Sequence, residues 1–259
     1  MTEHTQDKPR LYGKVAVVTG IGAGIGKGCA LMFARHGATV IGCDIDAAAA
    51  QATAAEAQEN GSSIEVVAPC DLTREKDVYA LMDGVGERHG AIHILLNAAA
   101  MAVFKPIEEM TLDDWQFTLR GELDLVFLAC KAAWPHMKKE GASIINLASA
   151  NAYLTLEGSP ALAHCAGKGG VLAMTRQLAA EGAPHGIRAN SISPGMIVTA
   201  ATSPVLDQPG FIDNVLAHNM VKRLGQPEDI GWAATFLASD ESTFVTAADL
   251  SVDGGATAL

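Results

Sequence analysis

Short apolar runs alternate along this chain with longer segments in which apolar residues recur every three or four positions. The short runs predict buried β-strands, and the longer segments predict amphipathic helices. The expected strands are 15–20, 38–44, 64–69, 91–97, 142–148, 187–193 and 249–252. The expected helices are 24–36, 46–59, 73–88, 111–138, 160–182 and 227–238. Because nearly continuous apolar strands separated by helices are typical of a parallel sheet covered on both faces, the pattern predicts an α/β fold.

Two segments depart from this alternation. Residues 1–10 are polar with mixed charge, which does not fit a secretory signal, and we expect residues 1–12 to form a flexible N-terminal tail. Residues 13–259 are then one doubly wound domain with a mostly parallel, seven-stranded sheet. Within it, residues 199–222 hold Pro204, Pro209 and Gly210 beside apolar Phe211. We expect this segment to be a substrate lid over the carboxyl ends of the strands, with a plain surface loop as the alternative.

Composition narrows the function classes. The 259 residues carry a formal net charge of −11, which argues against nucleic acid and anionic membrane partners. No apolar run approaches the length of a membrane span. The five cysteines lack paired spacing, so we expect reduced thiols in a cytoplasmic protein. The histidines show no ligand spacing for a metal, and none is expected.

The most informative local feature is a glycine-rich turn between the first expected strand and helix. It contains Thr19, Gly20, Gly22, Gly24, Ile25 and Gly26. Glycines there permit a tight turn and a close approach of backbone to a diphosphate, which then faces the helix N-terminus. Asp44 follows the second strand at the spacing of a carboxylate that binds both ribose hydroxyls of NAD. Because Asp44 would repel the 2′-phosphate of NADP, we expect NAD as cofactor.

Further motifs resemble the short-chain dehydrogenase/reductase family over nearly the whole chain after Arg10. The matching segments are Thr19-Gly20-(x)3-Gly24-Ile25-Gly26, Cys70-Asp71-Leu72, Leu95 to Ala100, Ser193 to Thr199, Arg223 to Ile230 and Val252 to Gly255. The resemblance implies a Rossmann-type domain that uses NAD, binds a small-molecule substrate and forms a homotetramer or homodimer through helices 111–138 and 160–182. Beyond the turn and Asp44, it implies cofactor contacts from Ile45, Asp71, Leu72, Asn97, Ala98, Lys168, Pro194, Gly195, Ile197 and Thr199.

The catalytic positions depart from the family's usual Asn, Ser, Tyr and Lys. Ser149 and Lys168 match, but His164 stands four residues before Lys168, where the family has tyrosine, and Glu122 stands where it has asparagine. Residues four apart share a helix face, so His164 and Lys168 both point at the nicotinamide. A neutral imidazole is a competent base near pH 7. We therefore assign Ser149, His164, Lys168 and Glu122 to catalysis.

Glu122 lies on an apolar helix stripe, and a buried carboxylate is costly unless it meets a cation. Lys168 and His164 are both candidate partners, and solvation at the helix edge is the alternative. Tyr153, four residues after Ser149, is either a substitute phenol or a pocket wall.

Three functions stay open. The first is hydride transfer between NAD(H) and an apolar, cyclic or aromatic alcohol or ketone. Its pocket wall would be Met101, Phe104, Tyr153, Leu154, Met196 and Phe211. The second is non-standard chemistry on bound NAD, such as elimination, dehalogenation, ether cleavage or isomerisation. The third is a redox-inactive, NAD-sensing protein.

Overall fold

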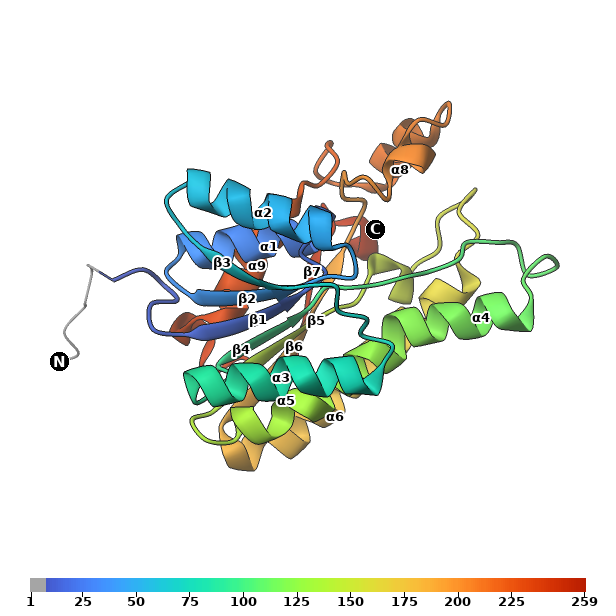
Figure 1. The fold of residues 1–259 in the computed structure, drawn as a ribbon. Helices are drawn as coiled ribbons and strands as arrows, with labels where there is room; N and C mark the ends of the chain where they lie inside the picture. Colours follow the sequence, from blue (N-terminus) through green and yellow to red (C-terminus); the bar gives the residue numbers. More distant parts are fainter. Residues whose placement is uncertain (1–7) are drawn as a thin grey trace.

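A computed structural model describes residues 8–259, within which seven strands form one parallel sheet (Figure 1). Their order in the sheet is β3-β2-β1-β4-β5-β6-β7. The strands are β1 Val15–Thr19, β2 Thr39–Cys43, β3 Ile64–Val67, β4 Ile94–Asn97, β5 Ala142–Leu147, β6 Ile187–Pro194 and β7 Asp249–Val252. The predicted doubly wound α/β fold is confirmed, and every paired strand is parallel rather than most of them.

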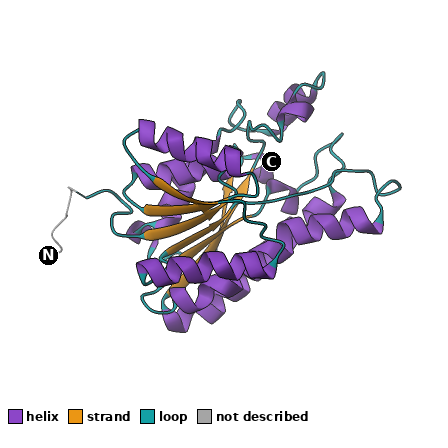
Figure 2. Cartoon of the chain, in the orientation of Figure 1, coloured by secondary structure: helices purple, strands orange, loops and turns teal. Residues whose placement is uncertain are grey.

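Two layers of helices cover the sheet, with α1, α2 and α9 on one face and α3, α5 and α6 on the other (Figures 1 and 2). Their bounds are α1 Gly24–Arg35, α2 Ala47–Glu59, α3 Glu75–His89, α5 Leu125–Met137, α6 Leu162–Gly182 and α9 Pro227–Ala238. All residues of β1 and β4 are buried because both of their faces pack against helices. Each face therefore has its own apolar core.

The register of the strands brings the residues at their carboxyl ends together at one edge of the sheet. Thr19 at the end of β1 pairs with Cys43 on one side and with Asn97 on the other. Asn97 pairs in turn with Asn146 of β5, and Leu147 pairs with Ile192 of β6. Because parallel strands share a direction, the residues that follow each strand gather at the same edge of the sheet.

The predicted helix 111–138 is interrupted. It consists of α4 (Leu112–Leu119), a π-helical turn (Arg120–Asp124) and α5, so Glu122 lies in the π turn. Gly121 lets the π turn lie against the backbone at Met101, because a Cβ at Gly121 would overlap the Met101 carbonyl. The Gly121 carbonyl accepts a hydrogen bond from the Met101 amide at 3.0 Å. The periodic apolar pattern predicts a helix, but it does not predict the single wider π turn within that helix.

Segment 199–222, predicted to be a substrate lid, forms two short helices, α7 (Ser203–Leu206) and α8 (Phe211–His218), and α8 stands beyond the carboxyl edge of the sheet (Figure 1). Phe211 and Val215 are the buried residues of α8. Asn214 Nδ2 donates to the carbonyl of Glu157 at 3.3 Å, which links α8 to the loop after β5.

Part of the predicted N-terminal tail, residues 8–12, packs against the domain. Residues 1–7 lie outside the described part, but Leu11 is completely buried and its amide donates to the His36 carbonyl at 2.9 Å. Arg10 and Glu241 form an ion pair at 2.6 Å, and Lys14 pairs with Asp240 at 2.9 Å. Residues 8–12 are therefore held against the domain by contacts with residues far away in the sequence. The polar character of the segment itself does not predict these contacts.

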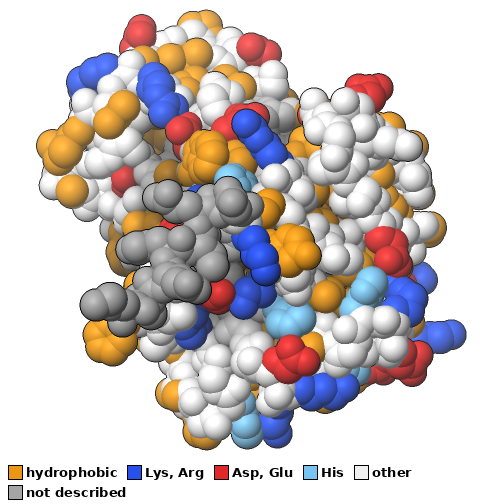
Figure 3. All heavy atoms as spheres, turned by 90° about the vertical axis from the view of Figure 1, so that its left-hand side faces the viewer, with side chains coloured by type: hydrophobic (Ala, Val, Ile, Leu, Met, Phe, Trp, Pro, Cys, Tyr) orange, Lys and Arg blue, Asp and Glu red, His pale blue; other side chains and the backbone are white. Residues whose placement is uncertain are grey.

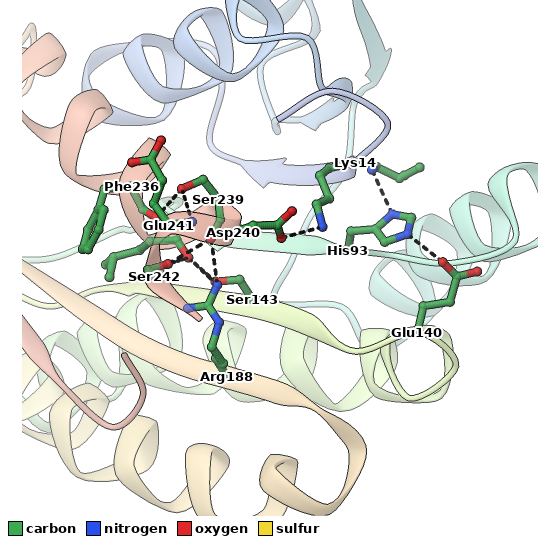
Figure 4. Close-up of polar contacts among 12 residues, drawn as sticks. Lys14, His93, Glu140, Ser143, Arg188, Phe236, Ser239, Asp240, Glu241 and Ser242 are labelled. Carbon is green, nitrogen blue, oxygen red and sulfur yellow. Dashed lines mark hydrogen bonds and ion pairs between the residues drawn. The ribbon is translucent and has the colours of Figure 1, made fainter. Parts of the chain in front are cut away.

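The amino edge of the sheet is closed by polar contacts (Figure 4). His93 Nδ1 accepts from the Val15 amide at 3.0 Å, and Nε2 bonds Glu140 at 3.1 Å. Arg188 donates to the carbonyls of Val245 and Leu237. Basic and acidic side chains are interspersed over this face (Figure 3). Within residues 8–259, no helix combines the length and apolarity that a membrane span requires.

Candidate active site

A cavity of about 440 Å³ opens at the carboxyl edge of the sheet. It is lined by the connections that follow β1, β2, β3, β4, β5 and β6, and by α6. The predicted cofactor residues that line it are Gly20, Gly24, Ile25, Gly26, Asp44, Ile45, Asp71, Leu72, Ala98, Lys168, Pro194, Gly195, Ile197 and Thr199. All the predicted catalytic residues also line it, namely Glu122, Ser149, His164 and Lys168.

Three predicted cofactor residues lie outside the lining and support it. Thr19 Oγ1 accepts from the amides of Ala98 and Ala99 at 2.9 and 3.1 Å, which fixes the turn after β4. Asn97 is buried, and its Nδ2 donates to Asn146 Oδ1 at 2.8 Å. The Gly22 amide donates to Asp44 Oδ2 at 2.7 Å.

The glycine-rich turn is too crowded for side chains at key positions. Gly20 has a φ of +74°, and a Cβ there would lie 2.8 Å from the Ala99 backbone. A Cβ at Gly26 would overlap the Gly20 carbonyl. The turn therefore packs on its own backbone and presents the N-terminus of α1 to the cavity, the arrangement that suits a diphosphate.

Gly20 and Gly61 offer a matched comparison for this crowding. Gly61 has a φ of +76°, but a Cβ there would meet nothing within 4 Å. Gly61→Ala should cost only the strain of the left-handed backbone, about 1–2 kcal/mol of unfolding free energy. Gly20→Ala should cost about 1–3 kcal/mol more through overpacking. Urea denaturation measures the unfolding free energy of both variants. Equal decreases in the two variants would show that the crowding between position 20 and Ala99 does not destabilise the protein.

Asp44 is fixed at the position predicted for a ribose-binding carboxylate. Its Oδ2 accepts from Gly22, and its Oδ1 accepts from the Asp46 amide at 2.9 Å. The crowded turn and the fixed carboxylate at one wall of the cavity fit a dinucleotide. Among residues 8–259, no cluster of His, Cys, Asp and Glu is arranged to hold a metal ion.

The predicted catalytic residues form a second group in the lining of the cavity. His164 Nδ1 lies 2.6 Å from Glu122 Oε1, so the carboxylate of the π turn meets the ring of α6. Lys168, one helical turn after His164, donates to the Leu147 carbonyl at 3.0 Å. Ser149 Oγ accepts from the Asn151 amide at 3.1 Å. The imidazole and not the ammonium is thus the hydrogen-bond partner of Glu122, and the alternative of a solvated Glu122 is wrong.

Burial shapes the electrostatics of this group. The side chain of Glu122 is only 2% exposed, and its Oε2 has no hydrogen-bond partner within residues 8–259. Burial lowers the pKa of Lys168, and the charge of Glu122 opposes that lowering. Gly167 makes room for the carboxylate, because a Cβ there would lie 3.0 Å from Glu122 Oε2.

Comparison with known proteins identifies the family of this chain. The family model described as enoyl-(acyl carrier protein) reductase matches residues 20–257. The D-threitol dehydrogenase of Mycolicibacterium smegmatis is 38% identical over 249 residues, covering 96% of this chain and 94% of that protein. The chain belongs to the short-chain dehydrogenase/reductase family.

Solved structures of this family bear on the cofactor. A 7α-hydroxysteroid dehydrogenase complexed with NADH and 7-oxo glycochenodeoxycholic acid has a TM-score of 0.90 at 34% identity, covering 96% of both chains. A gluconate 5-dehydrogenase from Burkholderia cenocepacia, in complex with NADP and tartrate, has a TM-score of 0.90 at 33% identity, covering 98% of both. The resemblance therefore supports a nicotinamide dinucleotide as the cofactor of this short-chain dehydrogenase/reductase.

The predicted substrate wall is mostly displaced from the cavity. Only Met101 of that set is among the residues that line it. The Phe104 ring packs against the His164 ring with centroids 5.3 Å apart. Tyr153 is exposed, lies outside the cavity lining, and its hydroxyl donates to Asp249 at 3.0 Å.

The remaining members of the wall lie elsewhere. Met196 lines a neighbouring hollow, Phe211 is a buried residue of α8, and the Leu154 amide donates to the Ala150 carbonyl in the turn after β5. The positions of these side chains depend on the direction that each loop takes. The polarity of a residue in the sequence does not predict that direction.

Other lining residues of this family member were not predicted individually. They are Ala23, Cys70, Thr73, Ala99, Ala100, Leu125, Leu147, Ala148, Ala200, Ala201 and Thr202. Most adjoin predicted motif residues and have small apolar side chains, which carry no chemical signal of their own. Leu125 could have been found, because it lies three residues after Glu122 on the same helical face.

Proposed function

We propose that this short-chain dehydrogenase/reductase transfers hydride between NAD(H) and an apolar secondary alcohol or ketone, with His164 as the proton carrier. The observation that carries the proposal is the 2.6 Å contact between His164 Nδ1 and the buried Glu122 carboxylate inside the cavity. Ser149 and Lys168 line the same cavity and complete the group.

Glu122 sets the state of the imidazole. A carboxylate accepts hydrogen bonds, so Nδ1 carries a proton and Nε2 presents its lone pair. The nicotinamide, when bound, accepts or supplies the hydride at the carbinol carbon. During oxidation, Nε2 takes the hydroxyl proton, and the Glu122 charge stabilises the resulting imidazolium. During reduction, the imidazolium returns that proton to the carbonyl oxygen.

Ser149 and Lys168 hold the reacting groups. Since Ser149 Oγ accepts from the Asn151 amide, its own hydrogen is free to be donated to the substrate oxygen. Lys168 is anchored to the Leu147 carbonyl and places a cation in the wall next to His164. That cation favours electron-rich oxygens of ribose and substrate in the cavity.

The preference for NAD rests on Asp44. Both of its oxygens are directed by backbone amides at the cavity wall, where a carboxylate accepts from ribose hydroxyls and repels a 2′-phosphate. No arginine lines the cavity to offset that repulsion among the described residues.

The substrate class rests on the composition of the catalytic end. The lining of the cavity includes the apolar side chains of Ala99, Ala100, Met101, Leu125 and Ala148. Phe104 adds an aromatic ring against His164. These side chains offer no hydrogen bonds to further hydroxyl groups, which favours a cyclic or aromatic alcohol over a polyol.

Steady-state assays test this function directly. Purified protein with NAD and a panel of cyclic, aromatic and polyol substrates should produce NADH absorbance, with higher kcat/KM for apolar alcohols. NADH should also bind at least about tenfold more tightly than NADPH, a difference of about 1.4 kcal/mol. NADH binding without absorbance change on any alcohol or ketone would contradict hydride transfer. Product formation at catalytic NAD without net redox change would identify elimination, dehalogenation, ether cleavage or isomerisation instead.

The proposal includes a cytoplasmic homotetramer or homodimer. The cysteines are free, in keeping with a reducing compartment. Phe117 and Phe127, on the α4–α5 segment, and Leu162 of α6 are large apolar side chains exposed on the helices predicted to meet symmetry mates. Sedimentation velocity should give a dimer or tetramer, and Phe127→Glu should shift it toward the monomer. A wild-type monomer at micromolar concentration would contradict this assembly.

A further inference from the structure

Two contacts of the His164 imidazole come from other segments of the chain. One is the 2.6 Å contact between its Nδ1 and Glu122 of the π turn. The other is with Phe104, whose ring centroid lies 5.3 Å from that of the imidazole, with 47° between the two planes. This separation and tilt lie in the range of favourable contacts between aromatic rings. Phe104 belongs to the loop between β4 and α4.

The loop that carries Phe104 is fixed to the segment that carries Glu122. Three hydrogen bonds join them: the Met101 amide donates to the Gly121 carbonyl at 3.0 Å, the Val103 amide donates to Thr118 Oγ1 at 3.0 Å, and Lys105 Nζ donates to Asp114 Oδ2 at 2.8 Å. Anchored residues therefore lie directly before and directly after Phe104.

The groups that hold these anchors are themselves well fixed. Thr118 is completely buried, and its hydroxyl donates to the Asp114 carbonyl at 3.0 Å. Asp114 forms a capping box with Thr111 at the N-terminus of α4. The hydrogen bonds from Lys105 and from Thr111 lower the pKa of Asp114 to about 2, so this carboxylate stays charged near neutral pH. All of these contacts lie within the chain, so the loop is preorganised.

Burial does not explain the place of the Phe104 ring. Phe104 is 52% exposed and lies outside the lining of the cavity. Its ring packs instead on the imidazole that does line the cavity. Glu122 and Phe104 thus belong to one hydrogen-bonded unit, residues 101–105 with residues 112–124, and this unit contacts the His164 ring in two places.

We propose that Phe104 is a positioning residue for His164, which confines the imidazole so that Nδ1 stays bonded to Glu122 and Nε2 stays available to the substrate oxygen. Without the Phe104 ring, the imidazole has room to rotate, and its Nδ1 leaves Glu122 for part of the time. The tautomer with the proton on Nε2 then becomes populated, and this tautomer cannot accept the proton of an alcohol. The inference rests on the proposed function, in which His164 carries the proton.

The tautomer can be measured directly and without turnover. Nitrogen-15 NMR of protein labelled at histidine reports which ring nitrogen carries the proton, at a pH where the imidazole is neutral. The His164→Ala spectrum assigns the His164 signals. We expect the wild type to hold the proton on Nδ1 alone, and Phe104→Ala to show a measurable contribution from the Nε2–H tautomer.

Kinetics measure the effect of this change on the reaction. Phe104→Ala should lower kcat by about 10- to 100-fold, the usual effect of a misplaced reacting group. The NADH Kd and the KM for the alcohol should stay within about twofold of the wild type, because Phe104 lies outside the cavity lining. Phe104→Tyr keeps the ring and should restore both the kcat and the single tautomer.

Ile107→Ala is the matched control. Ile107 is a large apolar residue of the same loop, beyond the three anchors and 71% exposed, so its loss should leave the tautomer and kcat unchanged. The proposal is overturned if the wild type already populates the Nε2–H tautomer, or if Phe104→Ala keeps a single Nδ1–H tautomer or the wild-type kcat. A wild type that transfers no hydride would contradict the proposed function, and the NMR comparison would still decide whether Phe104 positions the ring.

Discussion

Replacing His164 with alanine is expected to reduce kcat by roughly 10²- to 10⁴-fold, the usual contribution of a positioned general acid–base group. The His164 imidazole lines the cavity and contacts Glu122. Alanine is well tolerated in a helix, so the substitution removes the imidazole without disturbing the backbone. The NADH Kd should stay within about twofold of the wild type, less than about 0.5 kcal/mol. Steady-state kinetics and fluorescence titration measure the two quantities.

His185→Ala is the matched control. His185 follows the opposite end of α6, outside the cavity lining, so this variant should keep the wild-type kcat. Turnover that survives in His164→Ala would remove the imidazole from the mechanism and leave proton transfer to another group. Loss of NADH binding in the same variant would instead assign His164 to the cofactor site.

Glu122→Gln is expected to lower kcat by roughly 10²-fold or more, since an oriented carboxylate partner of a catalytic histidine contributes at least this much. Glutamine has nearly the same shape, so the side-chain oxygen can still accept from His164 Nδ1. It cannot supply the negative charge that stabilises the imidazolium. Stability should not fall, because the change removes a buried charge whose Oε2 lacks a partner. Thermal unfolding therefore separates a catalytic loss from a structural one.

The same variant has a predicted pH effect. Burial lowers the pKa of Lys168, and the Glu122 charge offsets part of that effect. Without the charge the pKa of Lys168 should fall further, so its ammonium loses the proton at lower pH. The alkaline limb of the kcat profile should then move to lower pH. Glu122→Asp, which keeps the charge, should restore the wild-type limb, and identical profiles in all three proteins would exclude electrostatic coupling between residues 122 and 168.

Much of the fold was predictable because each central strand is apolar on both faces and each helix has a polar side. The exceptions are instructive. The interruption at Glu122 depends on how closely Gly121 approaches Met101, a contact between segments 20 residues apart in the sequence. The docking of Leu11 depends on the His36 carbonyl, and a local pattern of polar residues gives no sign of it.

The site was predictable where chemistry is tied to strand ends, as at Asp44, Ser149 and the glycine-rich turn. Sequence reasoning narrowed the partner of Glu122 to Lys168 and His164, and the choice between them required the orientation of the π turn. Substrate contacts were the weakest predictions. Tyr153 and Met196 follow motifs closely, yet backbone direction carries them to other surfaces.

The absence of a side chain at Gly167 provides a criterion for classifying related sequences. A Cβ at 167 would lie 3.0 Å from Glu122 Oε2, so a side chain on the neighbouring helix would crowd the acid that reaches the ring at 164. Histidine, glycine and lysine at 164, 167 and 168, together with glutamate at 122, therefore constitute a single fingerprint. Chains that carry this foursome would be expected to share the same proton-handling chemistry, whatever their overall resemblance.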